Sequence, residues 1–167
     1  MKEKLAKYIK ENLILSKERL GMGARCRNVL FNDEAMFSCE EAQADITNYI
    51  EDNKNENKFQ TLLFKYIDER NLKDSDVYNK VHIDRRLFAK IRNNVDYHPS
   101  KETVILLALA LKLSLDEFIS LLESASYGLP KNNYYDLIIR FCFINKIYDI
   151  KEINELLILY DCELFSY

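Results

Sequence analysis

The chain has 167 residues, of which 48% are hydrophobic and 31% are charged, with only 3 glycines and 2 prolines. This composition excludes collagen-like, low-complexity and globally disordered chains. The scarcity of Gly and Pro also argues against an all-β fold, whose many turns use both residues. Because the net charge is −3, the whole chain is not a basic nucleic-acid wrapper, and any contact with nucleic acid has to be local.

The cysteines and the apolar stretches indicate the compartment. The longest apolar run, residues 104–111, is much shorter than the about 20 residues that a membrane span needs. The first ten residues alternate charged and apolar side chains, unlike a secretory signal. The four cysteines lack the spacing of a zinc site or a thioredoxin-like pair. We therefore expect a cytoplasmic protein, without a membrane partner, whose thiols are reduced: Cys26, Cys39, Cys142 and Cys162.

The first 57 residues are predicted to be a helical extension followed by a polar linker. Leu5, Ile9 and Leu13 recur at helical spacing, which predicts an amphipathic helix over the first twenty residues. A weaker helix is predicted to begin at Ser38, and the wholly polar residues 51–58 are typical of a solvated linker. This sets a boundary between residues 1–57 and residues 58–167. Three interpretations of the N-terminal helix stay open: a dimerisation arm, a partner-binding helix or part of the core.

The pattern becomes sharper from Phe59 onwards. Phe59, Leu63 and Ile67 lie on one helical stripe that ends before residue 71. Two short helices are then predicted, with Asp74 and Asp84 as N-caps, separated by a turn centred on residues 82–83. In the second of them, the apolar positions fall at helical spacing, with the basic residues mostly on the other side.

Four more helices follow in the sequence. Pro99 and Ser100 mark the start of a helix that is apolar nearly all round, so it is expected to have neighbours on several faces. Ser114 and Glu117 make a capping box for the next helix. Two C-terminal helices are predicted over roughly residues 133–145 and 150–160. The fold class is therefore all-α.

The middle of the chain carries the local positive charge that a nucleic-acid contact needs. Residues 76–101 hold six basic side chains and three carboxylates, a local net charge of +3. By contrast, no P-loop, dinucleotide-binding, nucleophile-elbow or zinc-protease motif occurs. We expect no catalytic residues, no cofactor and no metal, and so no enzyme.

Residues 73–122 resemble the lambda-repressor-like, or XRE-type, helix-turn-helix family. The resemblance rests on a short helix, a turn with Ile83, a cap at Asp84, and Phe88 and Ile91 facing inward. It continues in the Pro-Ser-Lys-Glu-Thr sequence that starts at residue 99 and the Ser-Leu-Asp-Glu-Phe sequence that starts at residue 114. The resemblance implies a lambda-repressor-like helical bundle, here with an N-terminal helical extension and two extra C-terminal helices.

A longer stretch is similar to a broader, uncharacterised bacterial family of small helix-turn-helix-like proteins. The shared sequences are Ile-Asp-Arg-Arg-Leu-Phe at residues 83–88 and Tyr-Asp-Ile-Lys-Glu-Ile-Asn-Glu at residues 148–155. The similarity extends from residue 59 to residue 165, and it bears more on the fold than on the function.

The XRE resemblance implies that the helix of residues 84–93 docks in the major groove of double-stranded DNA. In that arrangement, base edges are contacted by Arg85, Arg86, Ala89 and Lys90. Backbone phosphates are contacted by Lys80, Arg92 and Lys101. The leading hypothesis is a bacterial or phage DNA-binding regulator that acts as a homodimer on a pseudo-palindromic site.

Three positions depart from the family pattern and support a competing hypothesis. Tyr78 replaces a small Ala, and His82 replaces the Gly of the turn, where a left-handed backbone is needed. Leu87 takes a position that is usually exposed and polar, which indicates a possible protein contact. The alternative is therefore a non-enzymatic interaction adaptor that uses the same face, on which Arg85 and Arg86 are only solvated or paired with nearby aspartates.

Overall fold

The computed structural model describes residues 1–21, 59–94 and 96–166, and every regular element in these ranges is an α-helix. The all-α fold class is therefore confirmed. The predicted helix from Ser38 and the polar linker lie outside the described residues. The helices are α1 (Lys2–Gly21), α3 (Phe59–Glu69), α4 (Asp74–Lys80), α5 (Arg85–Asn93), α6 (Lys101–Ala110), α7 (Leu115–Ser124), α8 (Tyr134–Ile144) and α9 (Ile150–Ile158).

Side-chain caps set where most of these helices begin. The Ser100 hydroxyl accepts the Thr103 N–H at the start of α6, and the predicted capping box of Ser114 and Glu117 is present at the start of α7. The prediction that Asp74 caps α4 is wrong: Lys73 holds the N-cap position without a side-chain hydrogen bond. Asp74 instead lies inside the first turn, where its carboxylate faces an arginine of α5.

One type of turn ends six of the helices. The left-handed residue of each turn has φ between 49° and 58°, and none is a glycine: Asn71, His82, Lys112, Ser126, Lys146 and Asp161. The next N–H bonds to the carbonyl five residues earlier, for example Leu113 to Ala108 at 3.1 Å, which is the hydrogen bond of a Schellman motif. The residue after the left-handed one is apolar in each case. In five of the six turns this apolar side chain is buried or half-buried and adds to the helix packing, whereas Leu72 is exposed.

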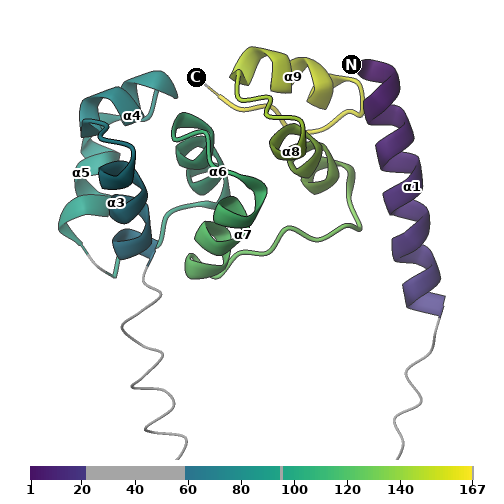
Figure 1. Ribbon diagram of the computed structural model, residues 1–167, viewed down its shortest axis with the longest axis horizontal. Coiled ribbons are helices and arrows are strands. Elements are labelled where there is room, and N and C mark those ends of the chain that lie inside the picture. The colour runs from purple at the N-terminus through teal and green to yellow at the C-terminus, as the bar shows by residue number, and fades with distance from the viewer. Residues whose placement is uncertain (22–58, 95, 167) are drawn as a thin grey trace, which may run out of the picture.

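The core is centred on α6, which lies between α4 and α7 (Figure 1). Every residue of α6 from Thr103 to Ala110 is buried, as the all-round apolar pattern predicts. The core continues into α8 through a close stack of Phe118 on Phe143, whose ring centroids are 3.9 Å apart. Because the burial of apolar surface is the dominant favourable term in folding, α6 is the element that orders the helices around it.

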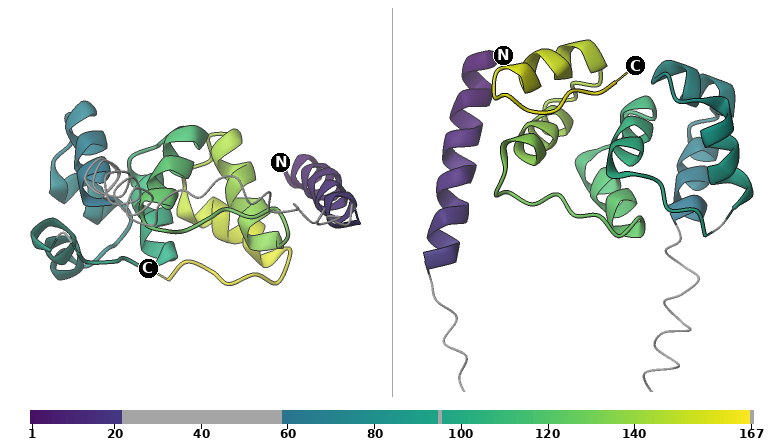
Figure 2. Two further views of the ribbon diagram at one scale, coloured as in Figure 1. Left: turned by 90° about the horizontal axis from the view of Figure 1, so that it is seen from below. Right: turned by 180° about the vertical axis from the view of Figure 1, so that it is seen from behind.

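The N-terminal helix α1 packs against α8. Leu5 and Ile9 are buried, and the Tyr8 ring lies 5.4 Å from the Phe141 ring. Of the three interpretations of this helix, the described side chains therefore favour the one in which it belongs to the core. Helix α1 forms one end of the elongated molecule and α3–α5 form the other (Figure 1 and Figure 2).

Candidate nucleic-acid interface

Helices α4 and α5 form a tight pair at the end of the molecule that lies opposite α1 (Figure 2). The turn between them carries His82 at φ 54°, so the left-handed conformation expected at this position is present with a histidine. Asp84 caps α5 as predicted, because its carboxylate accepts the Arg86 backbone N–H. The cap fixes the start of α5, and with it the direction of the side chains in its first turn.

The inward face of α5 holds it against the bundle. Phe88 and Ile91 are buried, as the sequence predicts. The Phe88 ring lies 5.5 Å from the Tyr78 ring and 6.1 Å, edge-on, from the Phe64 ring. The Tyr78 ring thus packs beside Phe88. With this face packed, the opposite face of α5 is left for solvent.

That outward face carries the predicted base-contacting residues. Arg85, Arg86, Ala89 and Lys90 are all exposed. Within the residues that the structure describes, the side chains of Arg85, Arg86 and Lys90 make no hydrogen bond and no ion pair. The alternative that the arginines pair with Asp76 or Asp84 is therefore not seen. Three unpaired cations on one helical face leave their hydrogen-bond donors available to an anion.

Arg92 is engaged within the protein. Its Nε lies 2.7 Å from Asp74 Oδ2 and its Nη2 donates to Asp74 Oδ1 at 2.9 Å. Its guanidinium also lies 4.4 Å from the centroid of the Phe64 ring. Although the sequence predicts a phosphate contact for Arg92, the structure uses this side chain to tie α5 to α4 and α3, and Asp74 neutralises its charge.

The other two predicted phosphate contacts also have polar partners within the protein. The Nζ of Lys101 lies 2.6 Å from Asp136 Oδ1, and only 3% of the Asp136 side chain is exposed. The Nζ of Lys80 donates to the Ala110 carbonyl at 2.8 Å. Burial, followed by repulsion from Lys112, lowers the pKa of Lys80. Of the seven predicted DNA-contacting residues, four have no side-chain partner within the described ranges: Arg85, Arg86, Ala89 and Lys90.

Leu87 is half-buried and packs in part against the core, so it is less exposed than the sequence suggests. A contact of Leu87 with another protein stays a prediction. The physical reason is the helical period, since Leu87 precedes the buried Ile91 by four residues and lies on the same side of α5. The outward face of α5 is consequently polar and cationic around Ala89.

A hollow of about 380 Å³ lies between α4 and α5, which sequence reasoning does not reveal. Arg85 and Ala89 line it on one side, and Asp74 and Ser75 line it on the other. Asp74 and Asp76 lie in the first turn of α4, so the start of that helix repels anions. Of the two helix starts beside this hollow, that of α5 is therefore the one that suits a phosphate.

In the part of the chain that is described, no group of three or more His, Cys, Asp or Glu side chains is placed to hold a metal ion. The same part contains no helix with the length and apolar character required to cross a membrane. No family model matches the chain, and no curated protein or solved structure matches it.

Proposed function

We propose that this protein is a regulator of transcription that binds double-stranded DNA through α5, with α4 and α5 acting as an XRE-type helix-turn-helix. The observation that carries the proposal is the outward face of α5, where Arg85, Arg86 and Lys90 are exposed and unpaired within the described residues. The resemblance of residues 73–122 to the XRE-type family also implies that this face of α5 contacts DNA.

The contact follows from the dimensions of a helix. With its side chains a helix is about 10–12 Å across, and the major groove is about 12 Å wide. Arg85 and Arg86 lie in the first turn of α5, the end from which a docked helix contacts base edges. Each arginine that bonds bidentately to guanine contributes about 1–3 kcal/mol of discrimination. Ala89 leaves room for close approach and can contact a thymine methyl group.

A homodimer is part of the proposal. Two copies related by a twofold axis present two α5 helices, which matches a pseudo-palindromic site with half-sites about one helical turn apart. Since Lys101 and Arg92 are paired inside the protein, each subunit contributes few phosphate contacts. Two subunits on one site double that number, which helps an acidic chain to bind DNA.

The adaptor hypothesis is the second candidate function. It rests on the net charge of −3, which opposes DNA binding, and on a protein contact at Leu87, which is half-buried. The remaining face of α5 is rich in arginine and lysine, a composition that suits phosphates better than an apolar partner.

The salt dependence of binding tests the proposal. Fluorescence anisotropy with a labelled random duplex is measured between about 50 and 200 mM salt, because each neutralised phosphate adds about −0.9 to the slope of log K against log salt. On a random duplex we expect a slope near −3 for the three or four contacts of one subunit, and a shallower slope for Arg85→Ala/Arg86→Ala. No binding at the lowest salt would contradict the proposal.

A further inference from the structure

Lysines gather at a second place, where helices α4, α6 and α8 end. Lys80 is the last residue of α4, while Lys112 and Lys146 are the left-handed residues that follow α6 and α8. All three line one hollow of about 500 Å³, together with Tyr148 and Asp149. Helices that are far apart in the sequence thus bring three ammonium groups to one concave surface.

A smaller hollow of about 180 Å³ adjoins the first and shares Lys80, Tyr148 and Asp149 with it. It adds Lys151 and an apolar lining that includes Ile150. We call the two hollows together the lysine groove, defined by Lys80, Lys112, Lys146, Lys151 and Tyr148. The side chains of α5 do not line it, so the lysine groove is separate from the proposed DNA-contacting face.

The groove carries a net positive charge, because four lysines and two carboxylates line it. None of its four lysines forms an ion pair within the described ranges. The carboxylates on its lining are Asp149 and Glu152, and Asp149 accepts the N–H groups of Lys151 and Glu152 as the cap of α9. Because an ammonium group has three donors, Lys80 keeps two after its bond to the Ala110 carbonyl.

Stabilisation of helix ends accounts for part of this arrangement only. A lysine near a helix C-terminus interacts favourably with the helix dipole, which applies to Lys80, Lys112 and Lys146. Lys151 is in the first turn of α9, where the dipole disfavours a cation. Lys112 also repels Lys80, whose pKa is lowered first by burial and then by this neighbour. An anion in the groove would relieve both unfavourable interactions.

We propose that the lysine groove is a binding site for a phosphate-bearing ligand with at least two negative charges. Lysine ammonium groups are common phosphate ligands that act as point charges from several directions. The ring of Tyr148 and the side chain of Ile150 offer an apolar surface beside the charges. The phosphate can come from a free small compound or from the backbone of bound DNA, and the site does not require that α5 binds DNA.

Isothermal titration calorimetry with tripolyphosphate, at about 50 mM salt, tests the site. The variant is Lys112→Asn/Lys146→Asn, because Asn tolerates the left-handed backbone that both positions adopt. The matched control is Lys10→Asn/Lys131→Asn, which removes the same charge from exposed positions outside the groove. We expect the groove variant to bind about tenfold more weakly than the wild type, a loss of about 1.4 kcal/mol, and the control to bind like the wild type.

A single-site variant distinguishes a loss of binding from a loss of folding. Lys151→Gln leaves both turns unchanged and should also weaken the binding of tripolyphosphate, while thermal unfolding shows that each variant is folded. The proposal is overturned if the wild type does not bind tripolyphosphate, or if the groove variant and the control bind it equally well.

A second arm identifies the source of the phosphate and separates this site from α5. If the groove variant makes the slope of log K against log salt for duplex DNA less negative by about 1–2, the groove holds the DNA backbone. If the slope is unchanged while the affinity for tripolyphosphate falls, the ligand is a free small phosphate. A wild type that binds tripolyphosphate but not DNA supports the groove and contradicts the proposed function of α5.

Discussion

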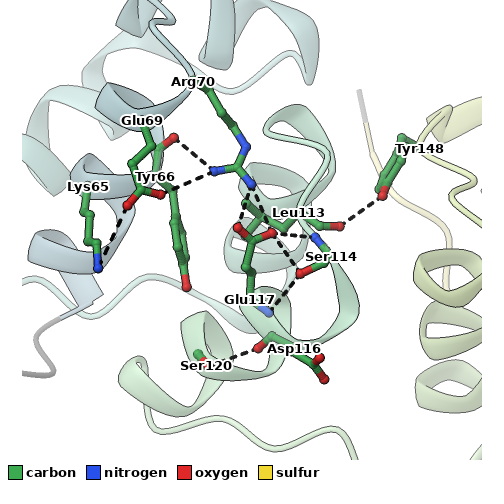
Figure 3. A network of polar contacts seen from close by, with 10 residues as sticks. All are labelled: Lys65, Tyr66, Glu69, Arg70, Leu113, Ser114, Asp116, Glu117, Ser120 and Tyr148. Atoms are coloured by element: carbon green, nitrogen blue, oxygen red, sulfur yellow. Dashed lines mark hydrogen bonds and ion pairs between the residues drawn. The ribbon is translucent and has the colours of Figure 1, made fainter.

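Arg70, which directly follows α3, and Glu117 of α7 are joined by one guanidinium nitrogen, which donates to both carboxylate oxygens at 2.8 and 3.0 Å (Figure 3). The same carboxylate accepts the Ser114 backbone N–H at 2.7 Å and the Ser114 hydroxyl at 2.9 Å. Glu117 therefore completes the capping box of α7 and docks α3 onto that helix. One side chain links helix initiation to tertiary packing.

This arrangement makes stability depend on pH in a defined direction. Burial alone raises the pKa of Glu117, but hydrogen bonds from Arg70 and Ser114 outweigh it and hold that pKa below the ordinary value of 4.5. A carboxyl whose pKa is lowered on folding stabilises the fold above its unfolded pKa, and this contribution is lost as the pH falls through the folded pKa.

Glu117→Gln should lower the free energy of unfolding by about 1–3 kcal/mol at pH 7. The difference from the wild type should shrink below about pH 4.5, because protonated Glu117 resembles Gln. Urea unfolding at pH 7 and at pH 3.5 measures it. A difference of the same size at both pH values would contradict the assigned role of Glu117.

Two variants of Asp84 separate its cap from its charge. Asp84→Ala should lower the free energy of unfolding by about 1 kcal/mol, because the Arg86 N–H loses its acceptor. Asp84→Asn keeps a capping side chain and removes a negative charge beside Arg85 and Arg86. It should therefore bind DNA a few-fold more tightly than the wild type at equal salt. Unchanged or weaker DNA binding by a folded Asp84→Asn would count against phosphate contacts at the start of α5.

The pair of Lys101 and Asp136 should matter for stability rather than for DNA. Lys101→Met leaves the buried Asp136 carboxylate without its cation, although Asn133 still donates to it, and should cost about 3 kcal/mol in chemical unfolding. Lys101→Met/Asp136→Asn should recover part of the loss, because the amide carries no charge to bury. If Lys101→Met instead keeps full stability and makes the slope of log K against log salt for DNA binding less negative, Lys101 is a phosphate contact.

At one of the left-handed turns, a substitution is expected to raise the free energy of unfolding. Ser126 is exposed and has φ 58°, a conformation that costs a non-glycine residue about 1–2 kcal/mol. Glycine removes this strain but increases the entropy of the unfolded chain by about 0.5–1 kcal/mol. Ser126→Gly should therefore raise the free energy of unfolding by about 0.5–1 kcal/mol, measured by thermal unfolding; a lower midpoint would contradict the account of the turn.

Structural features that depend on residues close together in the sequence could be predicted from the sequence alone. The start of α5 at Asp84 and the capping box of α7 depend on residues two or three positions apart, and the burial of α6 follows from its own composition. The turns after the helices were harder to predict. Glycine is the usual sequence signal for a left-handed turn residue, and here residues such as Lys112 and Lys146 hold that position.

The candidate site could be predicted only in part for a related reason. The outward direction of Arg85 and Arg86 follows from the helical period of α5. The partners of Arg92 and Lys101 lie 18 and 35 residues away in the sequence, so the packing of the helices decides them. The lysine groove requires the ends of three helices to meet, which no local pattern indicates.

DNA binding by the arginines of α5 can be measured against a control of equal charge. The most direct measurement compares the dissociation constant for duplex DNA, at about 50 mM salt, between Arg85→Ala/Arg86→Ala and the control Lys10→Ala/Lys131→Ala. Both variants lose two exposed cations and the same net charge. The account predicts a loss of at least about tenfold for the α5 variant and little change for the control. Equal affinities of the two variants would contradict it.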